Sequence, residues 1–273
     1  RLHVRGFTKH RSSGVKDRGT FGGIREKIPY LKELGVTAVE LLPVTEFDEV
    51  MVTEPAAGLP GQKPEATGRI NYWGYGPSFL YALKASYGSG ETEPEREFKE
   101  LVKALHRENM ECILEFYFTG KESPGDVLHV LRYWLQEYHV DGFIVNPVFF
   151  SAEEIAKDPI LSRTKILIHL NDYQNIMRRF LKGDEGMVND VMYWVNHHTE
   201  HIYNYITNQN GFTLNDLVSY DRKHNEENGE NNQDGPEYNY SWNCGAEGPS
   251  RKKAVMGLRK KQMTNALLLL FSA

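Results

Sequence analysis

The chain has 273 residues, of which 40% are hydrophobic and 12% aromatic, so it can bury one sizeable core and one domain is the first expectation. The formal net charge is −5, and 32 basic and 37 acidic side chains are spread along the chain, which argues against a surface that binds nucleic acid or an anionic membrane. Only Cys112 and Cys244 are present, and no apolar run approaches the length of a membrane span, so we expect a cytoplasmic protein without a disulfide framework.

Short apolar runs alternate with amphipathic stretches along the chain, which is the pattern of repeated βα units around a parallel sheet. In chain order, the predicted strands are Leu2–Phe7, Ala38–Leu42, Glu111–Phe116, Gly142–Val145, Ile166–His169, Tyr203–Thr207 and Leu267–Phe271. Apolar residues at helical spacing predict helices, each before the next strand, over Gly22–Leu34, Glu95–Glu108 and Val127–Tyr138.

Seven strands in this order predict an α/β fold, a (β/α)8 TIM-type barrel that stops after about its seventh strand. A doubly wound open sheet also alternates strands and helices but usually closes with fewer strands. The chain opens and closes inside predicted strands, as a piece of a longer protein would.

Two long irregular stretches, 48–72 and 219–250, are rich in Gly, Pro, Asn and Glu. Because long loops in a compact domain are uncommon unless functional, we expect both on the carboxyl-terminal face, where barrel active sites lie.

Four segments carry a resemblance to a known family, namely Asn71–Tyr75, Gly211–Tyr220, Glu227–Asn232 and Asn239–Gly245. The first is Asn-Tyr-Trp-Gly-Tyr and the last is Asn-Tyr-Ser-Trp-Asn-Cys-Gly. Together they resemble the isoamylase and glycogen-debranching branch of the alpha-amylase superfamily of glycoside hydrolases, and the resemblance covers essentially the whole chain. It implies that residues 1–273 are one incomplete catalytic barrel, since family members add an eighth strand and flanking β domains.

The resemblance also implies a reaction, the hydrolysis of α-1,6-glucosidic branches in glycogen or limit dextrin. That reaction needs two carboxylates about 5 Å apart, one as nucleophile and one as acid. A third carboxylate with its neighbouring His, and an Arg, complete the family's site. In this chain Ile144 stands at the position of the family's Arg, Asn146 at that of the nucleophile and His169 at that of the acid. Gln209 and Asn210 stand at the positions of the His and the third carboxylate. An amide cannot form the glycosyl ester that a carboxylate forms, so the resemblance implies a homologue without hydrolytic activity, a pseudoenzyme.

Three residues near these positions are candidates for binding substrate. Tyr75 and Trp73 could stack on a sugar ring, or they could anchor a loop as core aromatics. Glu115 is the one carboxylate that survives at the end of the family's third strand, where the pattern Asp-x-x-x-Asn-His has otherwise been lost, and it could also be a paired structural residue. The implied ligand is an α-glucan such as glycogen or a maltooligosaccharide.

Two alternatives to a glucan-binding pseudoenzyme remain open. An active α-1,6-glucosidase could use relocated carboxylates, with His169 as a new general acid and candidates at Glu115, Glu153, Glu154 and Asp172. A non-enzymatic partner or regulator of a true debranching enzyme would instead use the surface of the domain, which makes a protein partner conceivable.

No metal and no cofactor are expected. His197, His198 and His201 have a spacing seen in metal sites, but a solvated helix face explains them better. The stretch Asn225–Asp234 is rich in oxygen ligands, yet it lacks the spaced pattern of a calcium loop, and the family motif accounts for its composition.

Overall fold

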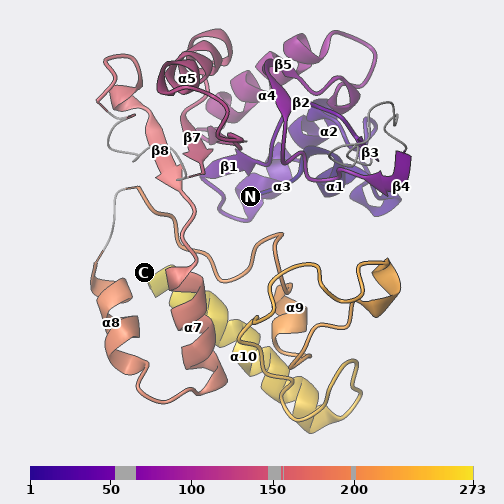
Figure 1. Cartoon of the computed structure of the whole chain (residues 1–273), viewed down its shortest axis with the longest axis vertical. Helices are drawn as coiled ribbons and strands as arrows, with labels where there is room; N and C mark the ends of the chain where they lie inside the picture. The colour runs from indigo at the N-terminus through magenta and orange to yellow at the C-terminus, as the bar shows by residue number, and fades with distance from the viewer. Residues whose placement is uncertain (53–65, 147–154, 156, 198–200, 273) are drawn as a thin grey trace, which may run out of the picture. The chain divides into compact units, whose positions relative to one another are not determined.

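The computed structural model describes residues 1–52, 66–146, 155, 157–197 and 201–272 (Figure 1). The chain divides into two compact units, Arg1–His169 and Leu170–Ala273. Each unit has its own hydrophobic core and is described by itself. The prediction that residues 1–273 form one domain stays a prediction.

The first unit contains a four-stranded parallel sheet in the order β1-β6-β7-β8. These strands are Ala38–Leu41, Glu111–Phe116, Gly142–Val145 and Lys165–Ile168. The two central strands, β6 and β7, are buried almost throughout and consist largely of apolar residues, as expected of parallel strands covered on both faces. Four predicted strands and the α/β class are therefore confirmed.

Two helices that were predicted from their periodicity pack beside this sheet. They are α4 (Pro94–Arg107) and α5 (Pro124–Tyr138). The fully buried Trp134 of α5 contacts Phe98 of α4 at a centroid distance of 6.2 Å and Phe116 of β6 at 5.5 Å. Helix α5 begins with a capping box, in which the Ser123 hydroxyl accepts a hydrogen bond from the backbone of Asp126 while the Asp126 carboxylate accepts one from the backbone of Ser123.

The strand predicted at Leu2–Phe7 is wrong, because the chain turns into a helix after three residues. Leu2 makes a single parallel bridge to Leu41, and α1 (Val4–Thr8) follows. His3 caps this helix, since its Nδ1 accepts a hydrogen bond of 2.9 Å from the backbone N–H of Gly6. A short helical turn (η1, Arg11–Ser13) comes next, and the helix predicted from Gly22 is split into α2 (Phe21–Glu26) and α3 (Ile28–Glu33).

Two small antiparallel pairs accompany the sheet. One joins β2 (Thr45–Phe47) to β5 (Ser78–Leu83), which leads into η2 (Ala85–Tyr87). The other joins β3 (Val50–Val52) to β4 (Ala66–Ile70) and lies within the stretch expected to be irregular. Between β7 and β8 the described chain also forms η3 (Leu161–Arg163).

The second unit has helices and irregular chain but no strand among its described residues, and this corrects two further strand predictions. It contains α7 (Asp172–Lys182), α8 (Val188–Asn196), the short α9 (Leu214–Leu217), η4 (Glu226–Asn228) and α10 (Lys253–Ser272). The apolar run Leu267–Phe271 is the last part of α10, where Ala266 packs into the core with Tyr173. Tyr203–Thr207 is irregular, and the Ile206 carbonyl accepts a hydrogen bond of 2.7 Å from Arg178 instead of pairing with a strand.

One buried arginine ties a loop of this unit to its longest helix. The side chain of Arg259 on α10 is 4% exposed, and its Nη2 donates to the carbonyls of Asn243, Ala246 and Gly248. A single buried side chain thereby bonds three backbone carbonyls of the loop.

None of the helices in the described part of the chain is long and apolar enough to cross a membrane.

Candidate functional site

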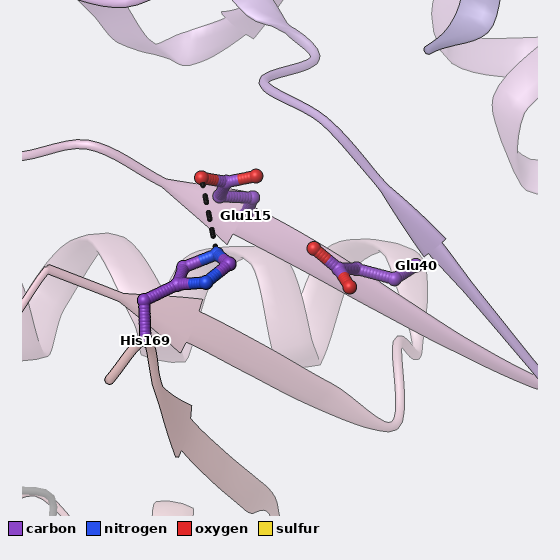
Figure 2. Close-up of side chains that lie close together, drawn as sticks. All are labelled: Glu40, Glu115 and His169. Atoms are coloured by element: carbon purple, nitrogen blue, oxygen red, sulfur yellow. Dashed lines mark ion pairs between the residues drawn. The ribbon is translucent and has the colours of Figure 1, made fainter. Parts of the chain in front are cut away.

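Three ionisable side chains lie together at the sheet of the first unit (Figure 2). Glu40 belongs to β1, Glu115 belongs to β6, and His169 directly follows β8. One ligand atom from each lies within 4.8 Å of the others. Both glutamates are buried, at 8% and 6% exposure, so their charges depend on partners within the protein.

The register of the parallel strands explains this grouping. Glu40 pairs with Ile113, and Glu115 is two residues further along β6, so both carboxylates project from one face of the sheet. Ile144 is the partner of Glu115 on β7 and is buried, so an aliphatic side chain occupies the position that the resemblance assigned to an arginine.

Arg1 supplies the positive charge that these carboxylates need. Its Nε lies 2.9 Å from Oε1 of Glu40, and its Nη2 forms an ion pair with Oε2 of Glu115. Tyr75 joins the group, since its hydroxyl donates to Oε1 of Glu115 at 2.8 Å and accepts from Arg1 at 3.2 Å. His169 completes it, with Nε2 at 3.6 Å from Oε1 of Glu115.

The two carboxylates have pKa values displaced in opposite directions. Burial, opposed by Arg1 and reinforced by the nearby charge of Glu115, raises the pKa of Glu40 to about 7. For Glu115, burial also acts upward, but the interaction with His169 and the charge of Arg1 outweigh it and lower the pKa below its usual value. Burial and the charge of Glu115 raise the pKa of the Tyr75 hydroxyl, so it stays a proton donor. Near neutral pH, Glu40 is therefore partly protonated beside the ionised Glu115.

Glu40, Glu115 and His169 also form the kind of group that could hold a metal ion. The Arg1 guanidinium already bridges the two carboxylates, so a metal ion would have to displace it. The arrangement fits an internal ion-pair network at least as well as a metal site.

Asn146, at the position corresponding to the family nucleophile, is held by the backbone of the neighbouring segment. It follows β7 directly, and its Nδ2 donates to the carbonyl of Phe118 at 2.8 Å while its Oδ1 accepts from the N–H of Phe118 at 2.9 Å. One donor and one acceptor in a plane reproduce the hydrogen bonding of a peptide group, so Asn146 continues the pairing of β6 and β7 beyond the strands. Both polar atoms of the carboxamide are thus engaged in structure.

The aromatic candidates lie in two different settings. Tyr75 contacts Tyr117 edge to face at 5.6 Å and belongs to the carboxylate cluster. Trp73 is 39% exposed and packs edge to face against Tyr72 and against His3, at 4.9 and 5.6 Å. Trp73 therefore anchors its loop while part of its ring remains open to solvent.

The remaining candidates are distributed as follows. Gln209 and Asn210 lie in the second unit, where the Asn210 N–H donates to the side chain of Asn208 at 3.0 Å. Asp172 begins α7 of that unit and is exposed. Glu153, Glu154 and His198 lie outside the described residues. The role of Glu153 and Glu154 as relocated carboxylates therefore stays a prediction, and so does the reading of His197, His198 and His201 as a solvated helix face.

Two members of the cluster, Arg1 and Glu40, were missed by sequence reasoning. The signal for Glu40 was a lone carboxylate within the apolar run Ala38–Leu42, because such a residue is buried only with a partner. Arg1 gives no comparable signal, since an arginine before a strand is ordinary.

Comparison with known proteins agrees with the resemblance. Residues 3–121 match the alpha-amylase family, described as the alpha amylase catalytic domain. The chain is 31% identical to the chloroplastic isoamylase 3 of Oryza sativa subsp. japonica, over 97% of this chain and 45% of that protein. It is 30% identical to the glycogen operon protein GlgX homolog of Mycobacterium tuberculosis, over 96% of this chain and 48% of that protein. The chain thus spans about half the length of these relatives.

A solved pullulanase of Paenibacillus barengoltzii, in complex with maltohexaose and alpha-cyclodextrin, is similar in fold. The TM-score is 0.63 at 15% identity, and the similarity covers 99% of this chain and 61% of that chain. The match to the rice isoamylase extends over 362 residues, which exceeds the 273 residues of this chain, so that relative carries internal segments that this chain lacks. Residues 3–121 thus match the alpha-amylase catalytic domain, and nearly the whole chain is similar in sequence to an isoamylase and to a glycogen operon protein.

Proposed function

We propose that this chain belongs to a protein of α-glucan metabolism that binds glucan chains and no longer hydrolyses their branches. The observation that carries the proposal is the state of Asn146. Its carboxamide cannot act as the nucleophile, and both of its polar atoms already bond to the Phe118 backbone, at 2.8 and 2.9 Å.

The rest of the cluster supports binding better than hydrolysis. Glu115 is engaged by Arg1, Tyr75 and His169, and an ionised carboxylate held by three partners is a weak nucleophile. Tyr75, by contrast, offers an aromatic face of the kind that packs on the apolar face of a pyranose. The names of the relatives, an isoamylase and a glycogen operon protein, make α-glucan the first ligand to test.

The first experiment measures reducing-sugar release from branched glucan and from pullulan by the full-length protein. A triple variant, Asn146→Asp with His169→Glu and Asn210→Asp, is assayed beside it. We expect no release above background from the natural protein. Turnover at ordinary enzymatic rates, about 1–1,000 per second, would overturn the proposal.

The second experiment tests glucan binding by calorimetry with maltohexaose. We expect Tyr75→Ala to weaken binding about tenfold, through loss of the aromatic face. Tyr30→Ala is the matched control, because Tyr30 is 49% exposed on α3 and its ring lies beneath the ammonium group of Lys27. Equal affinity of the two variants would contradict a role for Tyr75.

The pKa values favour one alternative, an active glycosidase with relocated carboxylates. Glu40, partly protonated near neutral pH, would serve as the acid and the ionised Glu115 as the nucleophile, which is the division of roles found in retaining glycosidases. Arg1 must leave both carboxylates before a sugar can reach them. If the natural protein hydrolyses glucan and both Glu40→Gln and Glu115→Gln abolish turnover, this alternative replaces the first proposal.

A further inference from the structure

The sequence contains two pairs of asparagine followed by glycine, Asn210-Gly211 and Asn228-Gly229, and both belong to the second unit. An asparagine before a glycine can lose its amide without any enzyme, because glycine has no Cβ to obstruct attack by its own backbone nitrogen on the neighbouring carboxamide. The sequence alone makes the two pairs equally reactive. The structure distinguishes them, since it holds one carboxamide by hydrogen bonds and leaves the other unbonded.

The first pair has no hydrogen bonds at either reacting group. Asn210 is exposed and lies in irregular chain shortly before α9. Its backbone N–H donates to Oδ1 of Asn208 at 3.0 Å, but no residue that the structure describes hydrogen-bonds its carboxamide. Within the same described chain, the backbone N–H of Gly211 also has no partner. No bond of this kind therefore has to break before the nitrogen of Gly211 can approach Cγ of Asn210.

The fold requires the glycine that makes Asn210 reactive. Gly211 has a backbone φ of +118°, and a Cβ there would lie 2.7 Å from Oδ1 of Asn239. Asn239 is 6% exposed, and that oxygen accepts a hydrogen bond of 3.0 Å from the backbone N–H of Phe212. A side chain at residue 211 would collide with this buried contact and would be strained by the positive φ. The reactive pair is thus a consequence of the local packing.

The carboxamide of Asn228, in contrast, is bonded at both of its polar atoms. Its Nδ2 donates to Oδ2 of Asp234 at 2.8 Å, and its Oδ1 accepts from the backbone N–H of Glu230 at 2.9 Å. These bonds fix the carboxamide, so turning its carbon toward the nitrogen of Gly229 costs free energy. Asn228 is exposed, as Asn210 is, and the two sites therefore differ in hydrogen bonding rather than in access to water.

We propose that Asn210 is a site of spontaneous deamidation, at which Gly211 and water convert it to aspartate and isoaspartate. The nitrogen of Gly211, after losing its proton to hydroxide, bonds to Cγ of Asn210, and the bond between Cγ and Nδ2 breaks. Nδ2 leaves as ammonia, and a succinimide ring remains. Water opens the ring at Cγ to give aspartate, or at the backbone carbonyl to give isoaspartate. One water is consumed, one ammonia is released and nothing is oxidised or reduced.

The reaction changes the charge of the protein and, in part of the product, its backbone. Each event makes the net charge one unit more negative, and isoaspartate lengthens the main chain by one carbon shortly before α9. Residue 210 is also the position that the resemblance assigns to the family's third carboxylate. An aged sample of the natural protein would carry a carboxylate there, as the Asn210→Asp variant does. Deamidation does not depend on whether the chain binds glucan.

The test follows loss of the two amides in the full-length protein by tryptic peptide mapping and mass spectrometry. Cleavage after lysine and arginine places the pairs in different peptides, residues 183–222 and 224–251, so each is quantified separately. We expect Asn210 to lose its amide at least about tenfold faster than Asn228, because the reaction at Asn228 must also break hydrogen bonds. The rate at Asn210 should rise with pH, since hydroxide removes the Gly211 proton.

Unfolding in urea is the internal control, because it removes the hydrogen bonds of Asn228 and should bring the two rates together. Asn210→Gln keeps the amide but would have to close a larger ring, so it should remove the isoaspartate signal from the peptide of residues 183–222. Asn228→Gln, the matched control, should leave that signal unchanged. The proposal is wrong if folded protein keeps the Asn210 amide over times in which urea-unfolded protein loses it. It is also wrong if folded protein loses both amides at equal rates.

Discussion

Replacing Asn146 by aspartate should destabilise the first unit, even though it restores the residue type that the family uses as its nucleophile. In the natural chain the Nδ2 of Asn146 donates to the Phe118 carbonyl at 2.8 Å. An ionised aspartate places a second acceptor there, so one hydrogen bond is lost and a carbonyl is left without a donor. The cost is about 1–3 kcal/mol at neutral pH. For a protein of this size that lowers Tm by about 2–4 °C for each kcal/mol.

The same variant should show a pH dependence of known sign. A protonated aspartate can donate to the Phe118 carbonyl, so folding favours the protonated form and raises the pKa of the new side chain. Its stabilising contribution is therefore complete below the ordinary aspartate pKa of about 3.9 and is lost as pH rises through the higher folded value. The stability deficit of Asn146→Asp should be small near pH 4 and largest at pH 7.

Urea denaturation of the natural protein and the variant at these two pH values measures the deficit. Asn265→Asp is the matched control, because it makes the same change of charge at an exposed position on α10. The reasoning would be refuted if Asn146→Asp were as stable as the natural protein at pH 7. It would also be refuted if its loss of stability changed with pH no more than the loss in Asn265→Asp does. Either result would mean that the hydrogen bonds to Phe118 do not hold Asn146.

Three further predictions follow from the cluster and its surroundings. Burial, despite Arg1, raises the pKa of Glu40 to about 7, so its contribution to stability is present below the usual glutamate pKa and is lost as pH rises through 7. Glu40→Gln should therefore lose less stability between pH 5 and 8 than the natural protein, as measured by thermal denaturation. Burial acts to raise the pKa of Glu115, but His169 and Arg1 lower it overall. The stability that the ionised Glu115 contributes is therefore lost as the pH falls. Glu115→Gln should be destabilised at pH 7 yet less sensitive to acid, and an unchanged acid midpoint would contradict this. Ser123→Ala removes the capping box of α5 and should cost about 1 kcal/mol in urea unfolding, whereas Ser162→Ala, outside any α-helix cap, should cost less.

The elements predicted correctly are those in which sequence pattern and burial agree. Helices α4 and α5 bury an apolar stripe against the sheet, and β6 and β7 are short apolar runs covered on both faces. The run Leu267–Phe271 misled because a short apolar stretch does not by itself distinguish a strand from a buried helix. The preceding residues from Lys253 onward settle it, since they already form the helix that this run continues.

The site was predictable only in part, for a physical reason. Tyr75, Glu115 and His169 belong to motifs and were found from them, and the structure brings all three together. Glu40 enters through strand register, which pairs it with Ile113 two residues before Glu115, and Arg1 enters by reaching both carboxylates. Register and side-chain reach are properties of the folded sheet, and a motif does not encode them.

The three carbonyls that Arg259 holds have a consequence for a chain shortened at its carboxyl end. The loop that carries them is itself bonded to the preceding stretch, because Asn243 donates to both carboxylate oxygens of Asp221, at 2.8 and 2.7 Å. A product ending before residue 259 would therefore keep the contact between Asn243 and Asp221 but lose the side chain that ties this loop to α10.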